Sequence, residues 1–396
     1  MYDRRISLSV QDPACGGILV LKNTALVVAS LLFSLVLVEL GLRLLDPLNV
    51  QPHVSRSIAN VPLVNDEYYF CKGGPSQLVP HPVVFSRDTP NQSYFEFRND
   101  RASFFEINSH GFRGSFGADE GRGRVLVLGD SFTRGTLADE TETIPALLSE
   151  WSTDSHFVNL GTGGHGTMQH ALTYREFKDK IPHEAVLLFA FTGNDLVDNI
   201  RFSEWQKDPT ARTTEPTTSQ WLKQMAVKLY IGKLLQGFSN SVSQESKFAS
   251  APTDKERGLL LNSLADLSQA VAENGARLFV FSLPEISEFV GSDKATFRED
   301  PVGYGNAARE LIEQAAKANE FTYIDLKPSL VEASDRMKVP TTALFGQPDH
   351  HLQEVANYAL AQTVADALEN EGVTDFARDA QFIDRTRFDP AAVTCP

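Results

Sequence analysis

Positive charge is scarce in this chain. Its 396 residues include 36 lysines and arginines against 51 aspartates and glutamates, which gives a net charge of −15 at pH 7. No compact basic cluster interrupts this acidic balance. Because nucleic-acid binding needs a basic surface, we expect no nucleic-acid partner.

Several sequence signatures of bound groups are also missing. The chain has no His-x-x-x-His or His-Glu-x-x-His pair, which argues against a zinc hydrolase. A glycine-rich stretch at 161–166 lacks the Gly-Lys-Ser/Thr ending of a phosphate-binding loop and the spacing of a dinucleotide site. No repeat recurs at a fixed period. We therefore expect neither a metal nor a cofactor.

The remaining composition is ordinary for a globular protein, with 42% hydrophobic and 22% charged residues. The length suits one large domain with attachments, and a core of roughly 250 residues can bury most of its apolar surface.

The stretch Val125–Thr133 is the most informative part of the sequence. A run of branched apolar residues ends abruptly in Gly129-Asp130-Ser131, which predicts a buried parallel strand followed by a sharp turn. Ser131 would then lie at the carboxyl end of a strand, where ligands bind in open α/β sheets. Ser131 is therefore a candidate nucleophile, and an ordinary loop or helix N-cap is the alternative.

Two further strands are expected to end in glycine and polar residues. A short strand at 157–160 enters a loop with glycines at 161, 163, 164 and 166, where the backbone can approach a ligand closely. The apolar strand Ala185–Phe191 leads to Gly193-Asn194-Asp195. The Asn194 amide can donate to an oxyanion, and a plain turn is the alternative.

The last block is Gly346–Leu352, which precedes an apolar-periodic helix predicted over 354–368. Of nine histidines in the chain, only His350 and His351 follow position 183. A histidine that takes the serine proton and an aspartate that fixes its tautomer would complete a Ser-His-Asp system. A surface pair is the alternative for an isolated Asp-His-His sequence.

These four blocks resemble, in order, those of the SGNH (GDSL-type) hydrolases, and specifically of membrane-anchored bacterial members. The resemblance covers roughly residues 105–370. It implies a catalytic triad of Ser131, Asp349 and His351. It also implies an oxyanion hole formed by the N–H groups of Ser131 and Gly164 and by the side chain of Asn194.

One departure from the family concerns the last block. The commonest family spacing is Asp-x-x-His, but the residues three positions before His350 and His351 are Gln347 and Pro348. The shorter Asp-x-His form also occurs in the family, and it fits Asp349 with His351 followed by Leu352. His351 is therefore chosen as the base, and His350 remains open.

The resemblance implies a serine esterase that hydrolyses an O-acyl ester, with an O-acetyl ester on a cell-surface carbohydrate as the expected substrate. Two alternatives stay open. One is an O-acetyltransferase for an exopolysaccharide that uses the same acyl-enzyme. The other is a catalytically inactive polysaccharide-assembly protein, against which the intact Ser131, Asn194 and His351 argue.

Strands and helices alternate along the rest of the chain. Helices are expected at 257–274 and 307–319, and strands at 277–282 and 322–326. This βαβ series predicts a parallel sheet flanked by helices. The fold class is therefore α/β, a flavodoxin-like three-layer α/β/α sheet as in the SGNH hydrolase fold, with an N-terminal transmembrane helix.

The N-terminal segment 24–45 is a mostly apolar stretch. As a helix it would be about 33 Å long, which is enough to span a hydrocarbon core of roughly 30 Å. A cleaved signal peptide is the alternative, but no small-x-small cleavage site follows. Arg4, Arg5 and Lys22 precede the segment, which favours a cytoplasmic N-terminus. We therefore expect a single-pass anchor in a bacterial inner membrane, with the catalytic domain periplasmic or extracellular.

The predicted organisation has five parts: a cytoplasmic segment at 1–23, the anchor at 24–45, a linker and strapping segment at 46–104, the catalytic domain at 105–370 and a tail at 371–396. The proline-rich segment 46–104 reads as irregular. An insertion at about 201–256 interrupts the domain, either as a lid or substrate wall or as a surface excursion.

Two smaller features complete the predictions. Upstream of the nucleophile block, Ile107–Gly114 is expected to form an edge strand and turn, with Arg113 in a structural salt bridge. Cys71 and Cys395 would both lie outside the membrane and could pair, whereas Cys15 would lie inside. Two lone thiols are equally consistent with the spacing.

Overall fold

The computed structural model describes residues 26–27, 29–30, 33–41, 68–74, 77–98, 101–116, 122–209, 251–290, 300–346 and 350–378. The chain divides into two compact units: residues 1–51 with 215–245, and residues 52–214 with 246–396. The second unit contains both the strapping segment and the α/β domain. Predictions on Cys15, Asp349, Cys395 and most of the insertion lie outside the described residues.

A five-stranded parallel sheet forms the centre of the second unit. In chain order its strands are β6 (Gly123–Gly129), β7 (Ser155–Asn159), β8 (Ala185–Phe191), β9 (Arg277–Leu283) and β10 (Thr322–Asp325). In space they follow the order β10-β9-β8-β6-β7, with every pairing parallel. This is the flavodoxin-like order, in which the connections reverse direction between β6 and β8. The predicted α/β class with a parallel sheet is confirmed.

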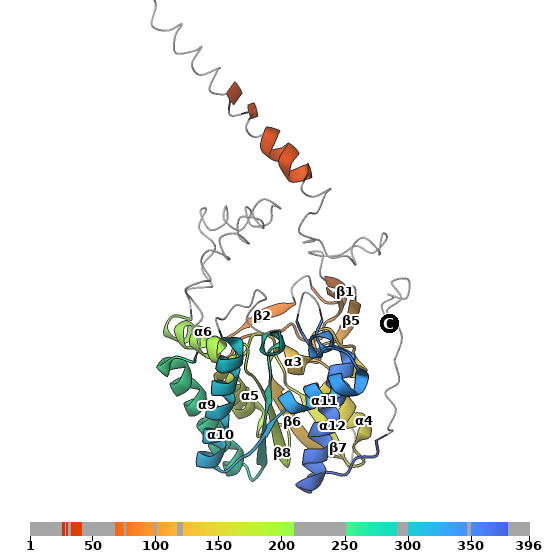
Figure 1. Ribbon diagram of the computed structural model, residues 1–396, viewed down its shortest axis with the longest axis vertical. Coiled ribbons are helices and arrows are strands. Elements are labelled where there is room, and N and C mark those ends of the chain that lie inside the picture. Colours follow the sequence, from red (N-terminus) through yellow and green to blue (C-terminus); the bar gives the residue numbers. More distant parts are fainter. Residues whose placement is uncertain are drawn as a thin grey trace, which may run out of the picture. The chain divides into compact units, whose positions relative to one another are not determined.

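Helices cover both faces of this sheet (Figure 1). One face packs against α4 (Ile144–Trp151), α11 (Lys327–Met337) and α12 (Glu354–Asn370). The other packs against α5 (Thr167–Phe177), α9 (Asp254–Glu273) and α10 (Pro301–Asn319). Every residue of β8 is buried, because a central strand covered on both faces carries apolar side chains continuously.

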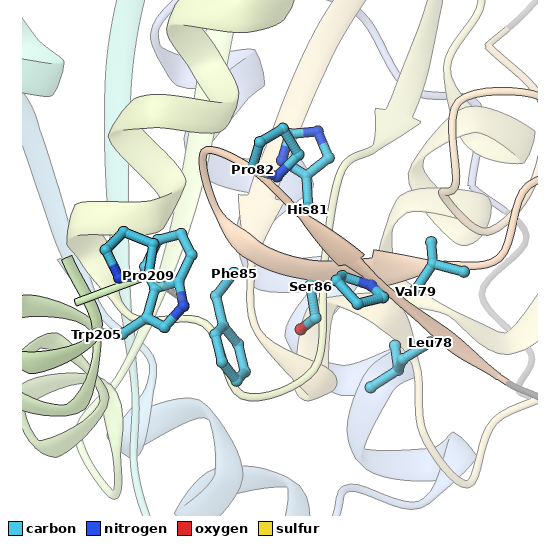
Figure 2. A pocket seen from close by; sticks show the side chains of 9 residues that line it. Leu78, Val79, His81, Pro82, Phe85, Ser86, Trp205 and Pro209 are labelled. Atoms are coloured by element: carbon cyan, nitrogen blue, oxygen red, sulfur yellow. The ribbon is translucent and has the colours of Figure 1, made fainter. Parts of the chain in front are cut away.

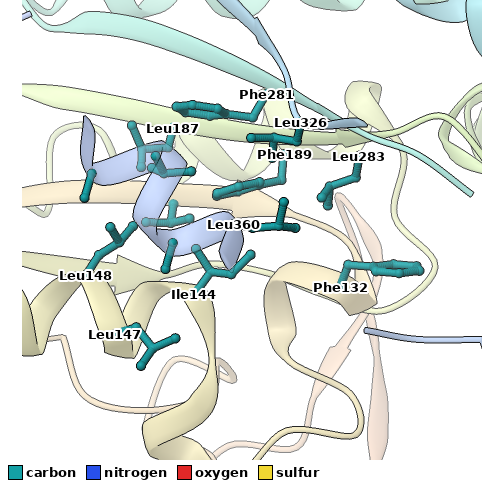
Figure 3. Packing of buried hydrophobic residues seen from close by; sticks show 14 of the residues in the cluster. Phe132, Ile144, Leu147, Leu148, Leu187, Phe189, Phe281, Leu283, Leu326 and Leu360 are labelled. Atoms are coloured by element: carbon teal, nitrogen blue, oxygen red, sulfur yellow. The ribbon is translucent and has the colours of Figure 1, made fainter. Parts of the chain in front are cut away.

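Close packing on the first face joins elements that are far apart in sequence. Leu187 and Phe189 of β8 lie in one buried cluster with Ile144 and Leu148 of α4 and with Leu360 of α12 (Figure 3). Three short 3₁₀ helices, η1 (Glu140–Glu142), η2 (Ile286–Phe289) and η3 (Thr341–Leu344), connect the larger elements. The cluster places the loop before α12 beside the end of β6.

The strapping segment contains regular structure, so its predicted irregularity was wrong. Strands β1 (Tyr68–Lys72), β4 (Ser93–Arg98) and β5 (Arg101–Glu106) form an antiparallel sheet, and β2 (Leu78–His81) pairs with β3 (Phe85–Asp88) as a hairpin. Pro82 and Pro90 lie in turns, and Pro80 lies on a two-stranded hairpin. Prolines at these places interrupt no central strand, so the segment tolerates them.

Two buried arginines join the strap to the helix that follows β6, α3 (Ser131–Arg134). Arg134 donates to both carboxylate oxygens of Asp88, at 2.8 and 3.0 Å. Arg113 forms an ion pair with Glu140 at 2.9 Å, and its guanidinium lies over the ring of Phe105. An isolated bridge pairs Ile107 with Arg113 across a turn, so the predicted turn and the structural salt bridge of Arg113 are confirmed, whereas residues 107–114 form no strand of their own.

The ends of the chain are described in part. Among residues 26–27, 29–30 and 33–41 the backbone is helical, and no helix within the described ranges is long and apolar enough to cross a membrane. Cys71 takes part in a disulfide whose partner lies outside those ranges. Residues 371–378 extend the domain beyond α12, because Phe376 bridges to Ser152 and the Ala377 N–H donates to the Trp151 carbonyl at 2.8 Å.

Candidate active site

The turn after β6 fixes the position of Ser131. Asp130 caps α3, and its carboxylate accepts a hydrogen bond from the Phe132 N–H at 2.9 Å. A Cβ atom on Gly129 would lie 2.0 Å from Thr133 Oγ1, so only glycine fits at this turn. Ser131 thus begins α3 at the carboxyl edge of the sheet and is partly exposed.

A histidine from the far end of the chain reaches this serine. His351 Nε2 lies 2.7 Å from Ser131 Oγ. Its loop closes on itself: the Gly346 N–H donates to the His351 carbonyl at 2.8 Å, and Phe345 bridges to Leu352. His350 is exposed, with a positive φ of 68°. The predicted acid, Asp349, lies in the segment 347–349, outside the described residues.

The ring of Phe132 holds the histidine from one side. Its centroid lies 4.7 Å from that of His351 and 4.1 Å from that of Phe191 at the end of β8. Phe132 is buried, so its ring has little room to move. It therefore acts as a positioning residue for His351, a role that the sequence pattern did not indicate.

The glycine loop after β7 packs directly against α3. Asn159 accepts a hydrogen bond from the Gly161 N–H at 2.9 Å and donates to the Thr133 carbonyl at 3.1 Å. A Cβ on Gly161 would lie 2.4 Å from the backbone nitrogen of Arg134, which excludes any larger residue at position 161. Gly164 is exposed and has a φ of 71°, a conformation that favours glycine.

The predicted oxyanion donors have no competing protein acceptors. In the described part of the chain, no acceptor takes the N–H of Ser131 or of Gly164. Asn194 is the N-cap residue of α6 (Asp195–Lys207), yet its side chain makes no capping hydrogen bond. Its Oδ1, an acceptor, is buried without a partner, and its Nδ2, the group that could donate to an oxyanion, makes no hydrogen bond within the same described ranges. Three polar groups from three strand ends are thus left unused at one edge of the sheet.

Buried carboxyl groups lie behind the serine. Burial raises the pKa of Asp130 to about 7, opposed by the hydrogen bond from Phe132 and by the nearby His351. Burial also raises the pKa of Asp195 and of Asp198, and repulsion between the three carboxyl groups adds to the effect for Asp130 and Asp195. A protonated carboxyl group is the form that such surroundings favour.

A cavity of about 280 Å³ opens beside the glycine loop. Gly164 lines it together with Gln169 of α5 and with Asp198, Arg201 and Phe202 of α6. Phe85 of the β2–β3 hairpin and Trp205 of α6 complete its wall. The sequence pattern gave no sign of Phe85, because the hairpin was not predicted. Trp205 lies in the predicted insertion at about 201–256, for which a substrate wall was one of the two alternatives.

Metal binding finds no support among the described side chains, where no group of three or more His, Cys, Asp or Glu residues could hold an ion.

Comparison with known proteins gives limited similarity. No protein-family model matches the chain, and no curated protein matches it. Among solved structures, TesA is 14% identical with a TM-score of 0.37, and covers 62% of this chain and 98% of its own. The acetyl xylan esterase AlAXEase is 14% identical with a TM-score of 0.39, over 62% of this chain and 99% of its own.

A member of the lipolytic protein G-D-S-L family from Veillonella parvula DSM 2008 is 12% identical with a TM-score of 0.37, over 62% of this chain and 98% of its own. Because these identities and TM-scores are low, the functional argument rests on the geometry of the site.

Proposed function

We propose that this chain is a serine esterase that hydrolyses carboxylic esters through a covalent acyl-enzyme. The observation that carries the proposal is the 2.7 Å contact between Ser131 Oγ and His351 Nε2 at the carboxyl edge of the sheet. A serine hydroxyl is a weak nucleophile by itself, and a histidine within hydrogen-bond reach activates it.

In the first half of the reaction, Ser131 Oγ attacks the ester carbonyl carbon while His351 Nε2 takes the hydroxyl proton. The carbonyl oxygen becomes an oxyanion, which the N–H groups of Ser131 and Gly164 and the Asn194 amide would stabilise. His351 then gives its proton to the leaving alkoxide, and the acyl group stays on Ser131.

In the second half, a water molecule attacks the acyl carbon while His351 takes its proton. The tetrahedral intermediate collapses, Ser131 recovers its proton from His351, and the carboxylic acid leaves. Asp349 would orient the imidazole through Nδ1 and stabilise the imidazolium. The donors at Ser131, Gly164 and Asn194 make no hydrogen bond to the described residues, which supports their assignment to the oxyanion hole. Loss of one such donor typically costs about 3–4 kcal/mol of transition-state stabilisation.

The test is hydrolysis of p-nitrophenyl acetate by the full chain and its variants. Ser131→Ala and His351→Ala should each lower kcat by roughly four orders of magnitude or more. His350→Ala is the matched control, because it removes the neighbouring exposed imidazole, and it should keep most of the activity. Equal loss in both histidine variants would contradict the assignment of the base. A fluorophosphonate probe should label the native chain and not Ser131→Ala.

The O-acetyl group and the cell-surface carbohydrate expected from the resemblance stay predictions. Acetylated polysaccharides offered as substrates test them directly, and added sugar acceptors test transfer against hydrolysis.

We also propose that residues 24–45 anchor the chain in a membrane with the esterase domain on the periplasmic or extracellular side. Large apolar side chains in the described part of this segment are at least half exposed: Leu26, Val27, Phe33, Leu35, Val36, Leu37, Val38 and Leu40. So much exposed apolar surface within the described part of one short segment typically marks an interaction site. The full chain should stay in the membrane fraction after an alkaline carbonate wash, and its release by the wash would contradict the proposal.

A further inference from the structure

A second, larger cavity lies between the β2–β3 hairpin and the end of α6 (Figure 2). Its volume is about 570 Å³, within the range of small-molecule sites. Most of the side chains around it are apolar, among them Leu78, Val79, Pro82, Phe85, Trp205 and Pro209. Two of the lining residues, His81 and Ser86, are polar.

This hairpin cavity adjoins the cavity at the glycine loop. Phe85 and Trp205 line both cavities, and their rings meet edge to face with centroids 5.7 Å apart. The smaller cavity reaches Gly164, and a Cβ on the preceding Gly163 would lie 3.7 Å from Ser131 Cβ. Gly163 therefore lies beside Ser131, and the next residue, Gly164, lines the smaller cavity, so both cavities lie on the glycine-loop side of the nucleophile.

The hairpin is firmly attached to the α/β domain. Arg87 forms two hydrogen bonds to the Glu176 carboxylate, at 3.2 and 2.9 Å. Gln169 donates to the Val84 carbonyl at 3.1 Å, and His165 Nε2 lies 3.0 Å from the Ser86 carbonyl. These contacts join the hairpin to α5 and to the glycine loop, so the cavity is preformed.

Phe85 has an unusual backbone conformation for so bulky a residue. It follows the turn 82–84, pairs with His81 and has a φ of 78°. Glycine is the usual residue at such a hairpin position, and a bulky side chain there is strained. A strained residue whose ring lies at the junction of two cavities indicates that the ring itself is needed.

We infer that the hairpin cavity receives the apolar chain of the acyl group, so that the substrate is an ester of a medium- or long-chain acid. This inference rests on the proposed esterase function and differs from the O-acetyl ester expected from the resemblance. The acyl side is assigned because His351 must protonate the leaving group, which therefore lies on the histidine side. No residue of the described histidine loop, 344–346 and 350–352, lines either cavity.

The experiment measures kcat/KM of the full chain on p-nitrophenyl acetate, butyrate, hexanoate, octanoate and decanoate, each below its critical micelle concentration. Each added methylene that enters the cavity should raise kcat/KM by roughly two- to fourfold until the cavity is filled. A parallel series of alkyl acetates, in which only the alcohol lengthens, should show no such rise.

Three variants test the assignment to this cavity. Trp205→Ala opens the hairpin cavity and Val79→Phe fills it. Each variant should lower the octanoate-to-acetate ratio of kcat/KM by about tenfold or more. Phe85→Gly relieves the backbone strain and should lower the same ratio while the melting temperature holds or rises. Val83→Ala is the matched control, because Val83 lies on the same hairpin, is 46% exposed and lines neither cavity.

Each outcome bears on a different claim. Serine-dependent turnover with a flat or falling acyl series would overturn the inference and leave the esterase intact. A rise along the alkyl acetate series would overturn the assignment to the acyl side. If the octanoate-to-acetate ratio were unchanged in both Trp205→Ala and Val79→Phe, the acyl chain would bind outside the hairpin cavity. Absence of serine-dependent turnover with every ester would instead remove the esterase proposal itself.

Discussion

His351 Nε2 lies 2.7 Å from Ser131 Oγ, although 220 residues separate the two along the chain. The contact depends on two packing arrangements: β6 occupies an interior position in the sheet, and α12 packs on the same face as α4. The loop before α12 is thereby held over the end of β6. The proposed chemistry therefore depends on residues that never touch a substrate.

Phe132→Ala should impair catalysis through His351. Loss of the ring frees the imidazole on the side where the two centroids are 4.7 Å apart. We expect kcat to fall by about 10- to 100-fold with little change in KM, because a misplacement of 1 Å or so is that costly. Phe157→Ala is the control, since it removes another buried ring from the same cluster. If both variants lost kcat equally, general destabilisation would be the better explanation.

Gly164→Ala should separate a backbone requirement from a catalytic one. Gly164 has a φ of 71° and Gly372 a φ of 62°, and an added Cβ meets nothing within 4 Å at either position. Alanine at either site should lower the free energy of unfolding by about 1–2 kcal/mol. Only Gly164→Ala should also lower kcat, measured on p-nitrophenyl acetate, because relief of the strained positive φ would turn the residue 164 N–H away from the oxyanion. Equal activity in the two variants would argue against an oxyanion role for Gly164.

Arg134→Met should strongly destabilise the protein. Arg134 and Asp88 form a buried ion pair, with side chains 4% and 0% exposed. Removal of the arginine leaves an unpaired buried carboxylate, which typically costs about 3–5 kcal/mol. Arg336→Met, which breaks an exposed pair with Glu332, should cost less than about 1 kcal/mol. Denaturant unfolding of both variants measures the difference. Similar losses in the free energy of unfolding would mean that the buried ion pair between Arg134 and Asp88 does not stabilise the attachment of the strap.

Asp130→Asn should change how stability depends on pH. The pKa of Asp130 is raised to about 7 by burial, so the folded state favours the protonated form. Its contribution to stability is complete below about pH 4 and is lost as the pH rises through about 7. Asparagine stays neutral and still offers an oxygen to the Phe132 N–H. As the pH rises over this interval, the free energy of unfolding of the variant should therefore increase relative to that of the native chain by roughly 1 kcal/mol per pH unit.

Denaturant unfolding at a series of pH values measures this gain. A difference that is constant across the interval would mean that Asp130 titrates normally in the folded protein.

Local pattern was sufficient for the central sheet and for the polar residues at its edge. The boundaries of β6, β8 and β9 were predicted within about two residues, because a strand that is buried on both faces has a continuous run of apolar residues. Ser131, Gly164 and Asn194 follow the ends of the parallel strands β6, β7 and β8. Because the carboxyl ends of parallel strands share one edge, their sequence positions already predicted a common site.

The strands of the strap escaped prediction for a physical reason. Strands β1–β5 are only four to six residues long, and Pro75, Pro80, Pro82 and Pro90 lie in or between the first four along the chain, so length and composition do not distinguish these strands from turns. The burial of Arg113 and Arg134 also could not be predicted, because an arginine is buried only where folding supplies its partners.

By itself, the sequence determined the strands of the central parallel sheet, the glycine turn before Ser131 and the polar residues that follow these strands, since these depend on neighbours along the chain. Only the tertiary structure decided that His351 reaches Ser131, that Phe132 lies against its ring and that Phe85 and Trp205 line two cavities beside the glycine loop. Such contacts join residues far apart in sequence. Their geometry comes from the packing of helices and a hairpin on the sheet, which no local pattern records.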